Sequence, residues 1–220
     1  MSRVLKFGRR AAKSGKATRL VVFLHGYGAD GADLLGLSQV LAPHLPNTVF
    51  VAPDAPEKPL MPGFGFQWFA IPRFDGSTEA QAAAGLARSS EDLNDFLDQR
   101  LADEGLTPAA LAIVGFSQGA MIGLHIAPRR ADPVAGVVAI SGRLIGPERL
   151  ASETLCQPPV LVMHGDLDEV VPFGEMAKAG NALVAAGFET YCHVMKGSGH
   201  GIAQDGLSVA LSFLKDRLPQ

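Results

Sequence analysis

Gly115-Phe116-Ser117-Gln118-Gly119 is the stretch of sequence that decides the fold. The apolar run at 111–114 predicts a strand before it, and residues 120–124 predict a helix after it. A serine flanked by glycines two positions away on each side, between a strand and a helix, is the pattern of a nucleophile elbow. Because glycine has no Cβ, the strand and the helix can approach closely and leave the serine exposed at the turn. Five residues match such a pattern by chance, so the rest of the chain has to support it.

The composition is that of a globular protein. The 220 residues include 47% apolar and 19% charged residues, with a formal net charge of −3. This length suits one domain with a substantial core, and the charge gives no reason to expect nucleic acid as a partner. No apolar run approaches the roughly 20 residues needed to cross a bilayer. We therefore expect one domain over residues 1–220, no stable membrane insertion and, without a recognisable secretory signal, a cytoplasmic location.

The N-terminus and the two cysteines need separate interpretation. Residues 1–29 are basic and carry no acid, which also occurs in transit peptides. Alternation at 4–7 and a turn-like stretch at 13–16 instead favour a β-hairpin over residues 1–18. Cys156 and Cys192 show no metal-ligand spacing, and a chain of this size needs no disulfide. We expect two free thiols and no metal site.

Strand-like runs alternate with helical patterns along the whole chain. The predicted strands are 19–24, 48–51, 111–114, 134–140, 160–163 and 189–195; the predicted helices are 32–45, 77–106 with a possible break near Gly85, 118–127, 147–155, 173–186 and 202–218. Such alternation predicts an α/β fold, with a mostly parallel twisted sheet and helices on both faces.

Four of the predicted strand ends carry polar, glycine-rich stretches, at residues 25–31, 115–119, 164–168 and 197–201. In open parallel sheets, ligands bind at the carboxyl ends of the strands. The coincidence of four such ends predicts a single active site.

The loop at 53–72 contains five prolines and a dense group of aromatic residues. Loops of this length without secondary structure are usually functional or disordered, and the aromatic content argues against disorder. We call residues 64–71 the aromatic segment; it includes Phe64, Phe66, Trp68 and Phe69. Two interpretations remain open, because these side chains either line a substrate pocket or plug the core beneath the loop. We expect a pocket role for at least one of them.

A serine nucleophile needs a base that takes its proton and a carboxylate that orients the base. Of the six histidines, His200 lies late in the chain between two glycines and is the expected base. His25 and His164 each precede a glycine at a strand end, where a histidine can instead hydrogen-bond the turn. His44, His125 and His193 lie within predicted helices or strands.

The acid cannot be chosen from the residues alone. Asp166 and Asp168 both follow the strand at 160–163, and their spacing does not distinguish them. Asp54 and Asp205 are weaker candidates. The order serine, acid, histidine is that of the α/β-hydrolase arrangement.

Acyl transfer also needs donors aimed at the developing oxyanion. The backbone N–H of Gln118, at the start of the elbow helix, is the first expected donor. The second is the backbone N–H of Tyr27, where two neighbouring glycines let the chain turn toward the site. The same loop lacks both G-x-G-x-x-G and the P-loop lysine, which argues against a phosphate site.

Four segments in register resemble the phospholipase/carboxylesterase family of small α/β-hydrolases, which includes the acyl-protein thioesterases. They are Leu24-His25-Gly26-Tyr27-Gly28-Ala29-Asp30, Gly115-Phe116-Ser117-Gln118-Gly119-Ala120, His164-Gly165-Asp166-Leu167-Asp168-Glu169-Val170-Val171-Pro172 and Gly199-His200. The resemblance extends over about residues 17–217. It implies an α/β-hydrolase fold, and at this length the chain has no room for a large cap domain.

The resemblance also implies roles for individual residues. Ser117 is the nucleophile, His200 the base and Asp168, which stands just before Val-Val-Pro, the acid. It supports Tyr27 and Gln118 as backbone oxyanion donors. It further implies hydrolysis of carboxylic esters or thioesters without a metal or cofactor, and members are often homodimers.

One departure from the family pattern concerns the aromatic segment. Thioesterase-type members have Trp-Phe-Asp where this chain has Trp68-Phe69-Ala70, which is closer to the bacterial carboxylesterase branch. We therefore expect a serine carboxylesterase that hydrolyses short- to medium-chain acyl esters through an acyl-enzyme. The alternatives are an acyl-thioesterase or lysophospholipase with the same three residues and, less favoured, a non-catalytic binder of a small ligand.

Overall fold

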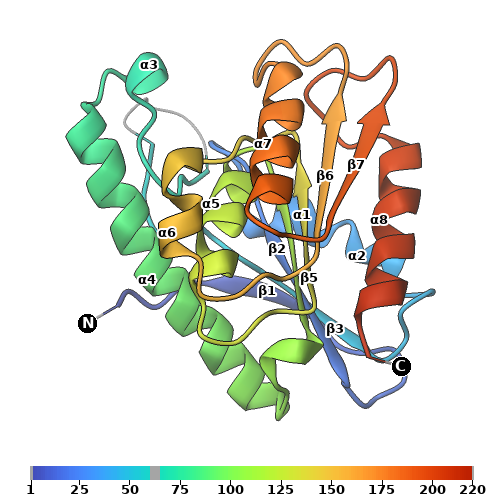
Figure 1. Ribbon diagram of the computed structural model, residues 1–220. Helices are drawn as coiled ribbons and strands as arrows, with labels where there is room; N and C mark the ends of the chain where they lie inside the picture. The colour runs from blue at the N-terminus through green and yellow to red at the C-terminus, as the bar shows by residue number, and fades with distance from the viewer. Residues whose placement is uncertain (1, 60–64, 220) are drawn as a thin grey trace.

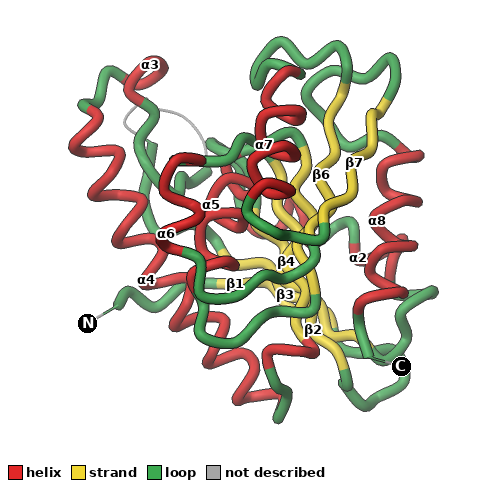
Figure 2. Tube along the Cα trace, in the orientation of Figure 1, coloured by secondary structure: helices red, strands yellow, loops and turns green. Residues whose placement is uncertain are grey.

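The computed structural model describes residues 2–59 and 65–219 and contains one seven-stranded sheet (Figures 1 and 2). The strand order is β1-β3-β2-β4-β5-β6-β7, with β1 antiparallel and the other strands parallel. The strands are β1 (Phe7–Arg10), β2 (Arg19–Leu24), β3 (Thr48–Pro53), β4 (Leu111–Phe116), β5 (Gly136–Ile140), β6 (Val160–Gly165) and β7 (Thr190–Met195). Every residue of β2, β3, β5 and β6 is buried, which explains their continuous apolar sequence.

Helices cover both faces of the sheet (Figure 1). They are α1 (Gly31–Leu35), α2 (Ser38–Leu41), α3 (Pro72–Asp75), α4 (Glu79–Glu104), α5 (Gln118–Ile126), α6 (Leu150–Glu153), α7 (Gly174–Ala185) and α8 (Gln204–Arg217), with short 3₁₀ helices at Pro108–Ala110, Ala127–Arg129 and Pro147–Arg149. One apolar core lies between the sheet and α4, α5, α6 and α7, and a second lies between the sheet and α1, α2 and α8. The predicted α/β-hydrolase fold is confirmed.

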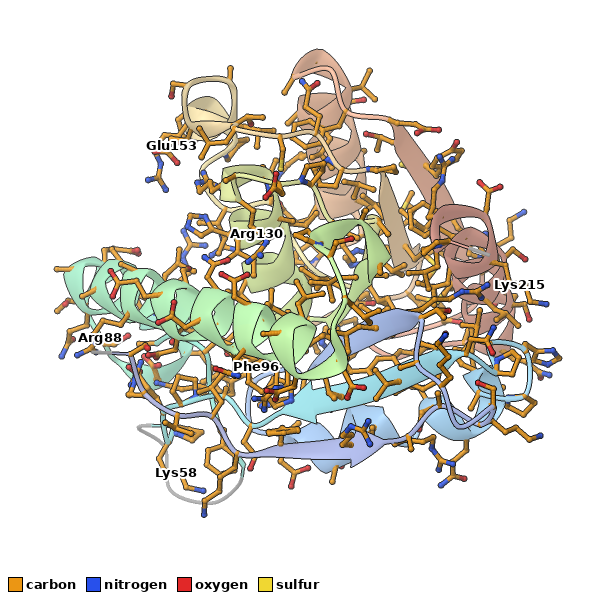
Figure 3. All side chains as sticks on the ribbon, turned by 90° about the horizontal axis from the view of Figure 1, so that it is seen from below. Lys58, Arg88, Phe96, Arg130, Glu153 and Lys215 are labelled. Atoms are coloured by element: carbon orange, nitrogen blue, oxygen red, sulfur yellow. The ribbon has the colours of Figure 1, made fainter. Side chains whose placement is uncertain are left out.

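The prediction of an N-terminal β-hairpin over residues 1–18 is wrong. β1 pairs antiparallel with β3, with Phe7 opposite Pro53, and it has no hydrogen-bonded ladder with β2. Both sides of β2 are occupied, by β3 and β4. The turn at 13–16 forms, but it leads into the interior of the sheet. Phe96 of α4 packs edge-to-face on Phe7, with ring centroids 5.4 Å apart, and so covers β1 (Figure 3).

Two predicted helices differ in detail from those observed. The helix expected over 32–45 is divided into α1 and α2. By contrast, α4 is continuous through Gly85, near which the sequence left a break open. A Cβ at this glycine would lie 3.4 Å from the Cα of Phe69, so its small size lets α4 pack against the aromatic segment. No helix in the described residues is long and apolar enough to span a membrane.

Candidate active site

Ser117 lies at the sharp turn between β4 and α5. Its backbone has φ 53° and ψ −116°, a region that non-glycine residues adopt only under strain. A Cβ at Gly119 would lie 1.9 Å from the carbonyl oxygen of Leu24, so the start of α5 packs directly on the end of β2. The packing of these two elements therefore holds the serine in its strained conformation.

The loop at 25–31 passes beside Ser117. A Cβ built on Gly26 would lie 3.3 Å from the Cβ of Ser117, so the loop packs closely against the serine at this glycine. Tyr27 is the next residue along the loop. On the other side of the serine, Gln118 is the first residue of α5, and an N–H in the first helical turn has no acceptor within its own helix. The structure thus brings both predicted oxyanion donors close to Ser117.

His200 and Asp168 form a hydrogen-bonded pair. Nδ1 of His200 lies 2.8 Å from Oδ2 of Asp168, and the carboxylate is completely buried while the imidazole is 18% exposed. The other oxygen, Oδ1, accepts hydrogen bonds from the backbone N–H groups of Val170 and Val171, each at 2.9 Å. Burial alone would raise the pKa of Asp168, but the hydrogen bond from His200 and those from the two backbone groups outweigh it and lower the pKa below its ordinary value. The carboxylate is therefore held ionised beside the imidazole.

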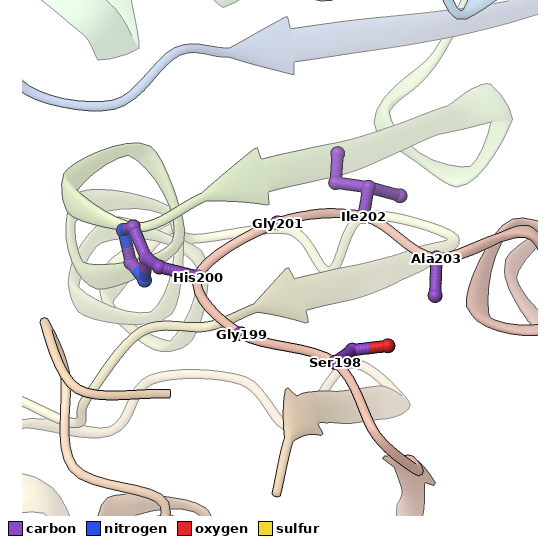
Figure 4. A pocket seen from close by; sticks show the side chains of 6 residues that line it. All are labelled: Ser198, Gly199, His200, Gly201, Ile202 and Ala203. Atoms are coloured by element: carbon purple, nitrogen blue, oxygen red, sulfur yellow. The ribbon is translucent and has the colours of Figure 1, made fainter. Parts of the chain in front are cut away.

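The His200 ring reaches the elbow. It packs on Phe116, the residue before Ser117, with ring centroids 4.9 Å apart. In Figure 4 the ring lies beside the end of a strand that leads into a helix, at one side of an open pocket of about 300 Å³ lined by Ser198–Ala203. A histidine with Nδ1 bound to a carboxylate presents Nε2 as a proton acceptor. The arrangement is suited to activating a hydroxyl at the elbow.

The structure distinguishes the two aspartates that the sequence left open. Asp166 does not meet the imidazole; its Oδ1 accepts a hydrogen bond of 2.7 Å from the backbone N–H of Gly197. A second hydrogen bond between the turn after β6 and the loop that carries His200 runs from the N–H of Leu167 to Ser198 O, at 3.0 Å. Asp166 therefore fixes the loop that carries His200, while Asp168 contacts the ring itself.

His25 bonds the turn, as one of the two interpretations predicted. It is fully buried, with Nδ1 2.7 Å from Gly26 O, and its Nε2 accepts the N–H of Ala55 at 2.9 Å. Burial lowers the pKa of this histidine, against the opposing effect of its hydrogen bond to Gly26. A neutral, doubly bonded imidazole is unsuited to proton transfer at the elbow.

The prediction that Trp68 and Phe69 of the aromatic segment line a substrate pocket needs correction. Trp68 is 0% exposed and belongs to the apolar core, so it plugs the core beneath the loop and does not line a pocket. Phe69 is also buried, at 5% exposure. Phe66 is half-buried, with Lys58 Nζ 3.7 Å from its ring centroid, and stays a candidate for contact with substrate. Phe64 lies outside the described residues.

Comparison with known proteins identifies the family. A match to the phospholipase/carboxylesterase family covers residues 10–218. The chain belongs to the phospholipase/carboxylesterase family. It is therefore an α/β-hydrolase-fold enzyme of the serine hydrolase class.

Relatives within the family include both thioesterases and esterases. The chain is 32% identical to acyl-protein thioesterase 1 of Saccharomyces cerevisiae, over 96% of this chain and 97% of the relative. It is 25% identical to esterase YpfH of Escherichia coli, over 93% and 85%. Among solved structures, esterase PE8 superimposes with a TM-score of 0.91 at 41% identity, covering 98% of this chain and 100% of that one.

Two contacts at this family site escaped the sequence analysis. His164 was expected only to bond its turn, and its Nε2 does lie 2.9 Å from Val171 O; it also lies 3.2 Å from Oδ2 of Asp168. The side chain of Gln118 bonds the backbone of the aromatic segment. In the sequence, the only signal for these contacts is that His164 and Gln118 are polar residues inside the motifs that also contain Asp168 and Ser117. No cluster of potential metal ligands occurs among the residues that the structure describes.

Proposed function

We propose that the protein is a serine carboxylesterase that hydrolyses short- to medium-chain acyl esters through an acyl-enzyme. Ser117 is the nucleophile, His200 the general base and Asp168 the acid that orients it. The observation that carries this proposal is a strained elbow serine whose neighbour, Phe116, packs on the ring of His200, a histidine with Nδ1 2.8 Å from a buried carboxylate. The backbone N–H groups of Tyr27 and Gln118 form the oxyanion hole.

Acylation begins with attack of Ser117 Oγ on the ester carbonyl carbon. Nε2 of His200 takes the hydroxyl proton, and the buried Asp168 stabilises the imidazolium that results. The negative charge moves to the carbonyl oxygen, where the two N–H groups stabilise the tetrahedral intermediate. Its collapse breaks the ester bond, and the leaving alkoxide takes the proton back from His200.

Deacylation repeats these steps with water. His200 removes a proton from the water as it attacks the acyl-serine ester, and the same donors stabilise the second intermediate. Ser117 then leaves and regains its proton from His200. Three hydrogen bonds to Asp168 support this cycle, since two from the backbone fix the carboxylate and the third, from Nδ1 of His200, holds the imidazole in one tautomer.

The proposal is tested by labelling and by substitution. A fluorophosphonate probe should label Ser117, and Ser117→Ala should abolish both labelling and p-nitrophenyl ester hydrolysis. Circular dichroism of the variant provides the folding control. Undiminished turnover by Ser117→Ala would disprove the mechanism.

A second candidate is hydrolysis of acyl thioesters or lysophospholipids by the same residues. The similarity to an acyl-protein thioesterase over almost the whole chain favours testing it. Oxyester and thioester substrates of matched acyl length, compared by kcat/KM from two to sixteen carbons, separate the two. A preference for long-chain thioesters would favour this second candidate.

We also propose a cytoplasmic location and a homodimer. The two cysteines of the described chain are free, which suits a reducing compartment. Fractionation of cells tests the location, and light scattering coupled to size exclusion gives the oligomeric state.

A further inference from the structure

The side chain of Gln118 binds the backbone of the aromatic segment. Its Oε1 accepts the N–H of Trp68 at 2.8 Å, and its Nε2 donates to Phe69 O at 2.6 Å. Gln118 is 1% exposed, so water does not compete for these two bonds. A buried amide that bonds two successive residues fixes both the position and the orientation of that backbone.

Each polar group of Trp68 makes a hydrogen bond, and the three partners lie on different elements of the protein. Besides its N–H bond to Gln118, its carbonyl oxygen accepts a hydrogen bond from Ser89 of α4. Its indole Nε1–H donates to His25 O at 2.9 Å. Trp68 thus connects α4, the start of α5 and the loop at 25–31.

The aromatic segment also pairs with the 25–31 loop through the backbone. Gly28 N–H donates to Phe66 O at 2.9 Å, and Phe66 N–H donates to Ala29 O at 2.8 Å. These two bonds enclose a short antiparallel bridge between Ala29 and Phe66. Together with the indole bond, they fix the 25–31 loop at both sides of Tyr27.

The sheet alone does not fix the distance between the two oxyanion donors. β2 and β4 are paired up to Leu24 and Gly115, but Tyr27 and Gln118 lie three residues beyond that pair. Beyond that pair the two loops pack directly at Gly119 and Gly26, and the hydrogen-bonded connection between them runs from His25 O through the Trp68 indole and backbone to the Gln118 amide. The donors therefore sit at the two ends of this connection.

We propose that Trp68 and the Gln118 side chain are positioning residues that set the spacing of the Tyr27 and Gln118 backbone N–H groups in the oxyanion hole. The inference rests on the proposed function, since it assigns the means by which that hole is held. Both side chains are buried, so they act through the backbone that they bond and not by contact with substrate. Their effect is on the transition state, because a hole of the wrong width binds the substrate carbonyl nearly as well but the developing oxyanion less well.

The test uses two substitutions that each remove bonds without removing an oxyanion donor. Trp68→Phe deletes the indole N–H and keeps an aromatic ring, and Gln118→Met keeps the length of the side chain and its backbone N–H. We expect kcat to fall about 10- to 100-fold in each, below the effect of losing a whole donor, with KM changed less than about 3-fold. A trifluoromethyl ketone forms a hemiketal with Ser117 Oγ, and the ketone oxygen becomes an oxyanion in the hole. Its inhibition constant should rise by the same factor as kcat falls.

Gln67→Met is the matched control. Gln67 is the neighbouring buried amide of the same segment, and its Oε1 has no hydrogen-bond partner. This variant should keep the kcat and the inhibition constant of the wild type. Hydrogen exchange of peptides covering residues 25–31 gives a second readout without substrate, and it should accelerate in Trp68→Phe but not in Gln67→Met.

Failure of the inference and failure of the proposed function give different results. Full turnover by Ser117→Ala contradicts the proposed function. If Ser117→Ala is inactive while Trp68→Phe and Gln118→Met keep wild-type kcat, inhibition constant and exchange, and lose only thermal stability, then the side chains are core filling and the inference is overturned. Assays are run at least 20 °C below the melting temperature of each variant, so that unfolding does not lower kcat.

Discussion

The elbow at residues 115–119 and the aromatic segment at 64–71 meet in the structure, yet they differ in what determines their conformation. The elbow is indicated by its own residues, because its glycines and the strand-to-helix pattern predict the turn, and motifs elsewhere in the chain support that prediction. The conformation of the aromatic segment depends on partners far away in sequence: His25, Ser89 and Gln118. The fully buried Trp68 lies at the centre of these contacts.

This difference teaches where sequence reasoning succeeds. A turn that requires glycine at fixed positions can be recognised locally, since few other residues satisfy it. A loop without secondary structure shows only which residues are apolar, and both a pocket wall and a core plug satisfy that pattern.

Asp166 and Asp168 have the same local context and different distant partners. Asp168→Asn should lower kcat about 10³- to 10⁴-fold, because the amide no longer stabilises the imidazolium of His200. Asp166→Asn keeps an acceptor for Gly197 N–H and should lower kcat less than about 10-fold. Steady-state hydrolysis of a p-nitrophenyl ester measures both. Equal losses in the two variants would contradict the assignment of Asp168.

Gly119→Ala tests the local rule at the elbow. The added Cβ would lie 1.9 Å from Leu24 O, so α5 has to move away from β2. We expect the free energy of unfolding to fall by about 3 kcal/mol or more. Urea denaturation measures it, with Gly174→Ala as the control, since a Cβ there meets nothing within 4 Å. A Gly119→Ala variant as stable and active as the wild type would mean that the elbow is not tightly packed.

Phe66→Ala separates two roles within the aromatic segment. Its backbone bonds to the 25–31 loop remain, but a half-buried ring is lost. We expect KM for a medium-chain ester to rise about 3- to 10-fold, the usual effect of removing apolar contact with substrate, with little change in kcat. Trp68→Phe should instead lower kcat and leave KM nearly unchanged. A fall in kcat with unchanged KM in Phe66→Ala would remove Phe66 from the substrate pocket.

His125 in the last turn of α5 gives the smallest expected effect. Burial, followed by the charges of Arg129 and Arg149, lowers its pKa from 6.5 to about 4. Between these values the unfolded chain takes up a proton that the folded protein does not, so stability falls as the pH decreases from 6.5 to 4. The loss is at most about 3 kcal/mol at pH 4, and less because part of the ring reaches solvent.

The pH dependence is checked by urea denaturation at several pH values. His125→Gln should flatten the slope of the free energy of unfolding against pH between pH 6.5 and 4, relative to the wild type. An unchanged slope in His125→Gln would show that His125 does not titrate in this way.

Much of the fold was predictable from the sequence. β2, β4, β5 and β6 are buried on both faces, so their apolar runs are continuous and easy to recognise. The partner of β1 was not predictable, since alternation indicates a strand but not its neighbour in the sheet. The continuity of α4 depended on the packing of Gly85 against Phe69, which the helical pattern does not show. The division of the helix at 32–45 into α1 and α2 was likewise not visible in the apolar spacing.

The candidate site was predictable to a similar extent. The pairing of His200 with one of two aspartates followed from strand order and family resemblance, and the structure places the imidazole on Asp168. The second contact to that carboxylate, from His164, was not predictable because it depends on how the turn at 165–171 folds back. The role of Trp68 was missed for the same reason, since its partners are 21 to 50 residues away.

The central claim is that Ser117, activated by His200, forms an acyl-enzyme. Rapid mixing of the protein with a p-nitrophenyl ester of a medium-chain acid, followed by acid quench and intact-mass spectrometry, measures it directly. We expect a mass increase of one acyl group, which peptide mapping locates on Ser117. The increase should be absent in Ser117→Ala. Ester hydrolysis by the wild type with no acyl adduct, or with the adduct on another residue, would contradict the claim.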